Sequence, residues 1–352
     1  MNLKTNVQNV GLSSMIKLKI GPWKLEEIND VPKNGLKVFS TFSCGGGSTM
    51  GYKLAGFEVI GCCEIDKQMA AIYKANHHPK YMFNMAIQDF NKLPDDKIPE
   101  ELFGIDILDG SPPCSSFSMA GSREKKWGEK HHFREGQAEQ HLDDLFFDFI
   151  QTAKRLQPKV VVAENVKGLI QGNAKGYVKQ IFQKFKDAGY SVQLFLLNAA
   201  AMGVPQRRER TFFIANRLDK KIKLEFDEKI ISFGNATLNV PNEKAVSYLT
   251  GESLKWWEKT PQGKSFSSVH PKKSWFNWVR LHPKEPTPTL ISSMGLNHYS
   301  EPRRLTKTEY CRVQTFPDNY NFLDQSSEYI CGMSVPPFMM QRIANQIAIQ
   351  LF

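Results

Sequence analysis

The 352-residue sequence lacks the features that mark several classes of protein. Its apolar runs fall far short of the roughly 20 residues that span a bilayer, so no membrane span is expected. The N-terminus spreads Lys4, Lys17 and Lys19 among short apolar pieces and has no apolar stretch of the secretory type. No internal repeat or low-complexity tract is present. These absences predict a cytosolic globular protein.

Cysteine pairs of the CxxC type are also missing, although the chain has six cysteines. A structural zinc site is therefore not expected, and no metal is predicted. In a reducing compartment the cysteines should be free thiols. The histidines at 131, 132 and 141 are interpreted as part of a solvated loop rather than as ligands.

Acidic residues are outnumbered, with 36 Asp and Glu against 46 Lys and Arg, which gives a formal net charge of +10. A basic chain favours a polyanionic partner, because neutralised phosphates release counterions. Charge alone fits a basic protein without such a partner equally well.

Residues 36–217 alternate short β-branched or aromatic runs with amphipathic stretches. This order predicts an α/β fold with a doubly wound, mostly parallel sheet, whose ligands lie at the carboxyl ends of the strands. The expected strands are 36–42, 57–65, 105–110, 159–166, 190–198 and 210–217. The expected helices between them are 48–55, 67–76, 143–156 and 175–188.

The chain divides into four expected segments. Residues 1–35 form an extension, 36–217 the main domain, 218–288 a smaller lobe, and 289–352 a closing segment whose last helix spans about 337–351. The smaller lobe is basic, and at least two of its tryptophans are expected to form its own core. Those tryptophans are Trp256, Trp257, Trp275 and Trp278.

A glycine turn at 42–47 joins a strand to a helix, and the next strand ends at Glu64. Glycines let a backbone approach a ligand closely, and the helix N-terminus presents free N–H groups. An acid about 20 residues downstream suits a ribose diol. Both a nicotinamide enzyme and an adenosylmethionine enzyme would fit this pattern.

One nucleophilic and one acidic residue lie at or just after the ends of other predicted strands. Cys114 comes directly after 105–110, where a thiol could act as a nucleophile if its surroundings favour the thiolate. Glu164 ends a very apolar strand, where a carboxylate is costly unless it is paired or functional. Period-two spacing places Arg208 and Arg210 on one face of a strand, where they could clamp phosphate or a base carbonyl. Together these groups suit methylation of a poor carbon nucleophile such as pyrimidine C5.

The sequence resembles the cytosine-C5 DNA methyltransferases of restriction-modification systems from about residue 36 to 352. The resemblance is carried by ordered motifs, namely FSCGGG (42–47), EID (64–66), PPCSSFS (112–118), ENV (164–166), QRRER (206–210), RRLTKTEYCRVQTFPDNY (303–320) and GMSVPP (332–337). It implies an S-adenosyl-L-methionine cofactor, double-stranded DNA as substrate, and a location in the bacterial cytosol or nucleoid. A monomer is expected, with a restriction endonuclease acting on the same site as a possible partner.

The resemblance also implies roles for the catalytic residues. Cys114 would add to C6 of a flipped-out cytosine, methyl transfer to C5 would follow, and elimination would release 5-methylcytosine. Pro113 would shape the cysteine loop and Asn165 would support it, while Glu164 would contact N3 and the exocyclic amine. The loop 119–141 is predicted to be a basic lid over the flipped base.

For the arginine motif, the resemblance implies that Arg208 contacts the base and that Arg210 orders the site and binds phosphate. Gln206 and Thr289 are predicted nucleic-acid contacts, and 218–288 would be the target recognition domain. The predicted cofactor-binding residues are Phe42, Gly46, Gly47, Glu64, Ile65, Ile87 and Ser334.

Several positions depart from the family's pattern. Cys44 replaces a glycine of the turn, Ser115 replaces the usual Gln after the cysteine, and Met333 replaces the usual Asn before Ser334. Two alignments of residues 85–90 with the family are possible, and they place either Ala86 or Asp89 at the adenine amine. The sequence leaves both possibilities open.

Three alternatives stay open at this stage. They are a tRNA cytosine-C5 methyltransferase on the same scaffold, a DNA-binding regulator with a degenerate catalytic core, and a nicotinamide oxidoreductase that shares only the glycine turn and Glu64.

Overall fold

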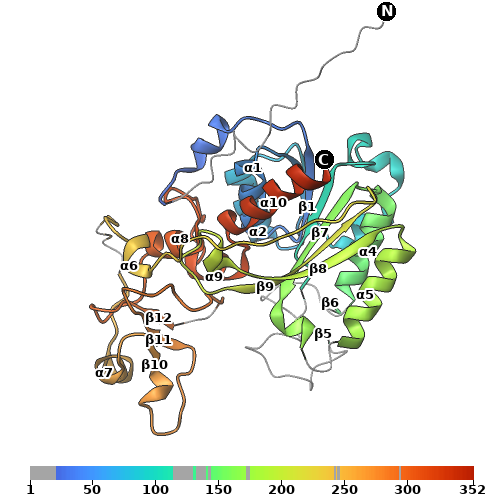
Figure 1. Ribbon diagram of the computed structural model, residues 1–352. Helices are drawn as coiled ribbons and strands as arrows, with labels where there is room; N and C mark the ends of the chain where they lie inside the picture. The colour runs from blue at the N-terminus through green and yellow to red at the C-terminus, as the bar shows by residue number, and fades with distance from the viewer. Residues whose placement is uncertain are drawn as a thin grey trace, which may run out of the picture.

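A computed structural model describes residues 21–113, 130–131, 140–141, 144–171, 175–241, 243, 246–292 and 295–352. Its centre is a seven-stranded sheet with the order β3-β2-β1-β4-β7-β9-β8. Strands β1, β7, β8 and β9 of this sheet are labelled in Figure 1. The strands are β1 (Lys37–Thr41), β2 (Glu58–Cys63), β3 (Tyr81–Phe83), β4 (Ile107–Gly110), β7 (Val160–Val166), β8 (Ser191–Asn198) and β9 (Glu209–Asn216). Neighbouring strands pair in parallel except at β9, which is antiparallel to both β7 and β8. The predicted α/β fold with a mostly parallel sheet is confirmed.

Helices cover both faces of this sheet (Figure 1). Val160 and Val162 of β7 belong to one buried cluster, whereas Val161 and Ala163 belong to the other. Successive side chains of a strand point to opposite faces, so the run of valines is buried on both sides. The first cluster includes α1 (Gly47–Leu54), α2 (Lys67–His77) and α10 (Pro337–Leu351), and the second includes α3 (Ile87–Lys92), α4 (Leu145–Leu156) and α5 (Lys175–Asp187).

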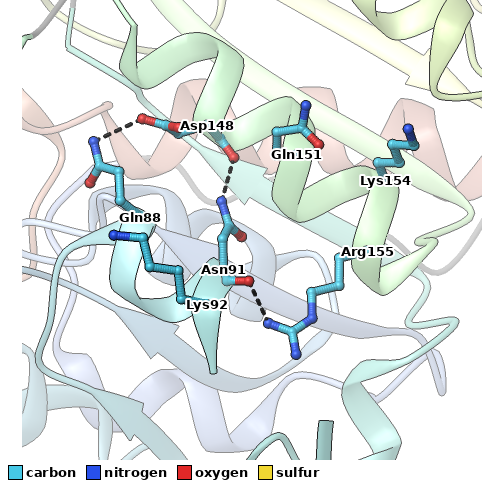
Figure 2. A pocket seen from close by; sticks show the side chains of 7 residues that line it. All are labelled: Gln88, Asn91, Lys92, Asp148, Gln151, Lys154 and Arg155. Carbon is cyan, nitrogen blue, oxygen red and sulfur yellow. Dashed lines mark hydrogen bonds between the residues drawn. The ribbon is translucent and has the colours of Figure 1, made fainter. Parts of the chain in front are cut away.

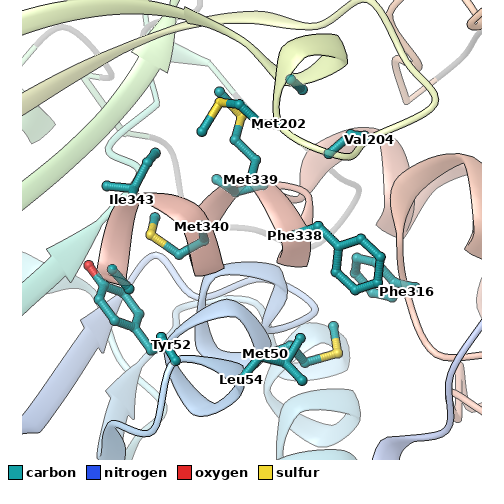
Figure 3. Packing of buried hydrophobic residues seen from close by; sticks show 14 of the residues in the cluster. Met50, Tyr52, Leu54, Met202, Val204, Phe316, Phe338, Met339, Met340 and Ile343 are labelled. Carbon is teal, nitrogen blue, oxygen red and sulfur yellow. The ribbon is translucent and has the colours of Figure 1, made fainter. Parts of the chain in front are cut away.

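The last helix, α10, brings the end of the chain back onto the first helix of the main domain. It begins after Pro336 with Pro337 at its first position, where a missing N–H is harmless. Met339 points toward Met202 and Met340 faces α1 (Figure 3). The predicted helix over 337–351 is confirmed, and it closes the fold around the glycine turn.

A second, three-stranded sheet lies in the smaller lobe, with the order β10-β11-β12. Its elements are β10 (Lys264–Ser265), β11 (Trp278–Arg280), β12 (Gly295–Asn297) and the nearby helices α6 (Phe233–Ala236) and α7 (Gly251–Lys259). Trp256, Trp257 and Phe266 form a separate buried cluster, as expected for at least two of the tryptophans. Because β12 follows residue 288, dividing the chain at 288 would cut this sheet.

The described part of the predicted N-terminal extension belongs to the main core. Trp23 is buried, and its indole N–H donates to the carbonyl of Thr315 at 3.0 Å. The backbone N–H of Leu25 donates to the side chain of Asn319 at 2.9 Å. Residues 21–35 therefore contribute to the fold rather than trailing from it.

The remaining elements connect these parts. They are the short strands β5 (Lys130–His131) and β6 (Gln140–His141), the helices α8 (Lys307–Gln314) and α9 (Ser327–Met333), and the 3-10 turns Leu25–Asp30, Asp95–Lys97, Glu100–Leu102, Lys167–Ile170, Ala199–Ala201 and Phe266–Ser268. Within the described residues, none of the helices combines the length and apolarity that crossing a membrane requires.

Candidate active site

A narrow crevice lies at the carboxyl ends of β1 and β4, the edge at which the sequence predicts a ligand. Its lining consists of Ser40, Thr41, Phe42, Ser43, Cys44, Gly47, Ser48, Asp109, Ser111, Met333, Ser334 and Val335. The cavity volume is about 20 Å³, which is room for about one water molecule.

The glycine turn is tightly wound and packs directly on the segment between α9 and α10. Phe42, Cys44 and Gly46 all have positive φ angles, of 51°, 44° and 71°. A Cβ atom on Gly47 would lie 2.1 Å from the carbonyl oxygen of Val335. Cys44, which replaces a glycine of the turn, thus has a backbone conformation that favours glycine.

Glu64, at the end of β2, holds this turn in place. Its two carboxylate oxygens accept hydrogen bonds from the backbone N–H groups of Cys44, at 2.8 Å, and Asp66, at 2.9 Å. Burial raises the pKa of Glu64. A carboxylate has further lone pairs, so it retains acceptor capacity for a ligand hydroxyl. The following residue, Ile65, is half-buried beside it.

The region predicted to contact adenine lies at the start of α3. Ala86 is the N-cap residue of this helix, and Ile87 is buried. The side chain of Asp89 is two-thirds exposed, with a carboxylate oxygen 3.7 Å from Nζ of Lys92. Asp89 therefore lies on the outer face of α3, and the register that places Ala86 at the adenine position fits the fold better.

A larger groove of about 580 Å³ lies on the other side of α3, against α4. Its polar side chains bond to groups within the groove itself. Gln88 donates to the Asp148 carboxylate at 2.8 Å, and Asn91 donates to the Asp148 backbone carbonyl at 2.9 Å (Figure 2). Arg155 donates to the Asn91 carbonyl at 2.9 Å. This groove is a polar contact between α3 and α4, whose side chains bond to groups of these same two helices.

Glu164 and Arg210 form a buried ion pair where β7 and β9 run side by side. The Nε of Arg210 lies 3.0 Å from Oε1 of Glu164, and both side chains are about nine-tenths buried. Such a pair holds the carboxylate in one orientation at the carboxyl end of β7. The structure thus places a partnered acid at the position where the sequence predicts a functional one.

Asn165 connects β7 to the segment that leads into the predicted nucleophile. Its side-chain amide donates to the carbonyl of Pro112 at 3.0 Å and accepts from Val166 N at 2.8 Å. This is the contact that a supporting role for Asn165 requires. Pro113 is the last described residue before a gap, so Cys114 itself, Ser115 and most of the predicted lid 119–141 lie outside the described residues.

Most of the other cysteines are poorly suited to act as nucleophiles. Burial raises the pKa of Cys44 and of Cys62 to about 12, and it also raises the pKa of Cys63 and Cys331. A thiol with such a pKa is almost fully protonated at neutral pH, and the thiolate is the reactive form. None of these four cysteines is therefore a better candidate for the nucleophile than Cys114.

Arg208 and Gln206 differ from their predicted roles. The Arg208 guanidinium is buried and donates to the carbonyls of Leu290 at 2.8 Å, Gly332 at 3.1 Å and Ser334 at 3.1 Å. The structure therefore gives Arg208 backbone contacts instead of the expected base contact, because the closing segment surrounds it.

Gln206 is fully buried, and it bonds Gln314 at 2.7 Å and Leu290 N at 2.9 Å. A side chain enclosed in this way offers no surface to nucleic acid, so the expected contact at Gln206 is corrected to a structural one. Thr289 is only half-buried, and its hydroxyl donates to the Arg207 carbonyl at 2.7 Å.

Ser334 lies against the glycine turn, as the sequence predicts for a cofactor-facing residue. Its side chain is buried, and its Oγ lies 4.0 Å from the Cys44 sulfur. The neighbouring Met333 is 39% exposed and also lines the crevice. An apolar side chain therefore stands at the mouth of the crevice, where the family usually has an amide.

Asp109 is a site residue that sequence reasoning missed. It stands near the carboxyl end of β4, is 2% exposed and lines the crevice. Ser40 donates to its carboxyl group at 3.1 Å and Tyr52 does so at 3.3 Å. The signal that singled out Glu164, a carboxyl group at the end of a buried strand, applies equally to Asp109.

Known proteins resemble this chain in sequence and in fold. A family model for the C-5 cytosine-specific DNA methylases matches residues 36–348. The type II methyltransferase M.NgoPII of Neisseria gonorrhoeae is 31% identical, over 89% of this chain and 96% of that protein. The type II methyltransferase M.FnuDI of Fusobacterium nucleatum is 30% identical, over 89% and 94%. A crystal structure of DNMT2 from Spodoptera frugiperda shares the fold, with a TM-score of 0.61 and 17% identity over 88% of this chain and 98% of that one.

Proposed function

Because the chain belongs to the C-5 cytosine-specific DNA methylase family, whose reaction is methyl transfer to carbon 5 of cytosine in DNA, we propose that it is the modification methyltransferase of a type II restriction system. The family match over residues 36–348 carries this proposal. Relatives named as type II methyltransferases support the restriction context. We further propose that it acts in the bacterial cytosol or nucleoid as a monomer, beside an endonuclease with the same target.

The polar groups that line the crevice suit S-adenosyl-L-methionine as the methyl donor. The buried hydroxyl of Ser43 has no hydrogen-bond partner among the described residues, and Asp109 brings a carboxyl group to the same crevice. These groups suit the polar methionyl end of the donor, while Glu64 and Ile65 would hold its ribose and adenine. When bound, S-adenosylmethionine supplies the methyl group to C5 of the target cytosine.

The residues around the crevice would have separate roles in the reaction on the cytosine base. The Cys114 thiolate would form a bond to C6, which makes C5 nucleophilic, while Glu164, oriented by Arg210, would hold a proton at N3. After methylation, loss of the C5 proton and cleavage of the carbon–sulfur bond would release the product. Since C5 and C6 are not accessible within a stacked duplex, the cytosine must be flipped out.

The test is to sequence bisulfite-treated DNA from cells that express the protein. We expect protected cytosines at one recurring sequence, and none in cells that express Cys114→Ala. A duplex that carries 5-fluorocytosine should form a covalent adduct with the wild-type protein and none with Cys114→Ala. Fully converted cytosines in both strains, with both proteins soluble and folded, would overturn the proposal.

A further inference from the structure

Asp109 is placed among hydroxyl groups from several elements. Ser40 of β1 and Tyr52 of α1 donate to its two carboxyl oxygens, at 3.1 and 3.3 Å. Ser48, at the start of α1, lines the same crevice, and its hydroxyl acts to lower the pKa of Asp109. Of the described residues that line the crevice, Asp109 is the one that carries a carboxyl group.

Among the described residues, no cationic side chain is one of the main influences on the Asp109 carboxyl group. The charged side chain that influences it most is Glu164 of β7, which is also acidic. Two phenols face it as well, Tyr52 of α1 and Tyr73 of α2. Burial, together with Glu164, raises the pKa of Asp109 to about 7. A buried carboxylate without a cation is costly, so the site is suited to receive one.

We propose that Asp109 is a cofactor-binding residue that recognises the positive charge at the methionyl end of the methyl donor. This inference rests on the proposed use of S-adenosylmethionine, which carries a sulfonium and an α-ammonium group at that end. The crevice that Asp109 lines is bounded by the glycine turn and by Ser334, the elements assigned to the cofactor. Met333, which replaces an amide at the same crevice, has no polar group for either cation.

Binding of the donor beside Asp109 would release a proton from its carboxyl group. Asp109 is about half protonated at pH 7 when no cation is present, because its pKa lies near that value. A cation held beside it in a site with little water favours the carboxylate, so its proton leaves when the donor binds. Donor affinity should then rise with pH up to about 7 and level off between about pH 7 and pH 8, where the donor's ammonium is still largely protonated.

Isothermal titration calorimetry in pairs of buffers with different ionisation enthalpies measures the released protons directly. We expect release of close to one proton at pH 6, about half a proton at pH 7 and almost none from Asp109 at pH 8.5. Below pH 6 the affinity should fall nearly tenfold per pH unit. The donor's own α-amino group, with a pKa of about 8, is fully protonated at pH 6 and does not contribute there.

Two variants separate Asp109 from the rest of the strand. Asp109→Asn keeps the shape and an acceptor for Ser40, and it should abolish proton release at pH 6 and bind the donor at least tenfold more weakly at pH 8. Asp106→Asn is the matched control. Asp106 lies directly before the first residue of β4, and its carboxylate forms an ion pair with Lys159 at 2.7 Å. This control should keep the wild-type proton release and affinity.

S-adenosylhomocysteine, which lacks the sulfonium charge, identifies the recognised group. Proton release with this ligand supports recognition of the ammonium, and its loss supports recognition of the sulfonium. Equal proton release by wild type and a folded Asp109→Asn variant would overturn the inference. No proton release by the wild type at pH 6 would also overturn it, whether or not the variant folds. Failure of the wild-type protein to bind the donor at any pH would instead overturn the proposed function.

Discussion

Arg208 and Arg210 stand two positions apart in the arginine motif at the start of β9, yet they hold different parts of the site. Arg210 pairs with Glu164 at 3.0 Å, whereas Arg208 donates to carbonyls of the closing segment. Arg210 is thus a positioning residue for the acid, and Arg208 joins the catalytic domain to the C-terminal motifs. The two side chains should therefore fail in different ways when they are removed.

Replacing Arg210 by Met should destabilise the fold by about 3–5 kcal/mol, because it leaves the buried Glu164 carboxylate without a partner. Adding Glu164→Gln should restore most of the stability in urea unfolding but not the methylation rate. Arg208→Met should cost about 1–3 kcal/mol for each carbonyl left buried and unpaired. The carbonyls that Arg208 binds are not bonded to Glu164, so Glu164→Gln should not restore the stability lost in Arg208→Met. If Glu164→Gln restored the stability of both arginine variants equally, the separate roles given to Arg208 and Arg210 would be wrong.

Sequence reasoning could place these two arginines on one face of a strand but not divide their roles. Period-two spacing follows from local geometry. The partners of Arg208 are 82 to 126 residues away in the chain, and only the packed fold brings them to it. The same limit explains Gln206, whose partner Gln314 lies 108 residues away.

Among the secondary-structure elements, the contact between α1 and α10 depends on a single glycine inside a helix. A Cβ atom on Gly51 would lie 2.4 Å from Cβ of Met340 and 2.7 Å from the Pro337 carbonyl oxygen. Glycine weakens a helix interior by about 1 kcal/mol relative to alanine. The close approach of α10 explains why glycine is nevertheless used here.

Gly51→Ala should therefore destabilise the protein by about 1–3 kcal/mol, although alanine is the better helix former. Gly176→Ala is the control, since Gly176 lies in the exposed first turn of α5 with open space around it. We expect that variant to be neutral or more stable by up to about 1 kcal/mol. Thermal unfolding of both variants measures the contrast, and a stabilised Gly51→Ala protein would rule out the tight helix contact.

The long elements followed from the sequence better than the short ones. Each strand of the central sheet except β3 was predicted, because buried β-branched runs bounded by turns are a strong signal. β3 has three half-buried residues, which are too few to show a period. The strands β10 to β12 have two or three residues each, and the tertiary contacts of the tryptophan cluster hold them in place.

At the scale of the whole molecule, the net charge of +10 is unevenly distributed along the chain. Residues 255–284 of the smaller lobe carry seven Lys or Arg and one acid. Lys272 and Lys273 of this segment are exposed. An exposed basic lobe joined to a catalytic domain suits contact with the phosphates of a duplex.

Affinity for duplex DNA should accordingly fall steeply with salt, by about 10³- to 10⁵-fold between 50 and 200 mM if 6–10 phosphates are contacted. Replacing Lys272 and Lys273 by Gln should reduce the slope of log K against log salt by about two, because two phosphate contacts are lost. The methylated sequence should not change, since phosphate contacts position the protein without reading bases. Lys97→Gln serves as the control, because Lys97 is also exposed but lies beside Asp96 in the 3-10 turn Asp95–Lys97 of the main domain. If the double variant keeps the wild-type slope, the DNA does not lie against this part of the lobe.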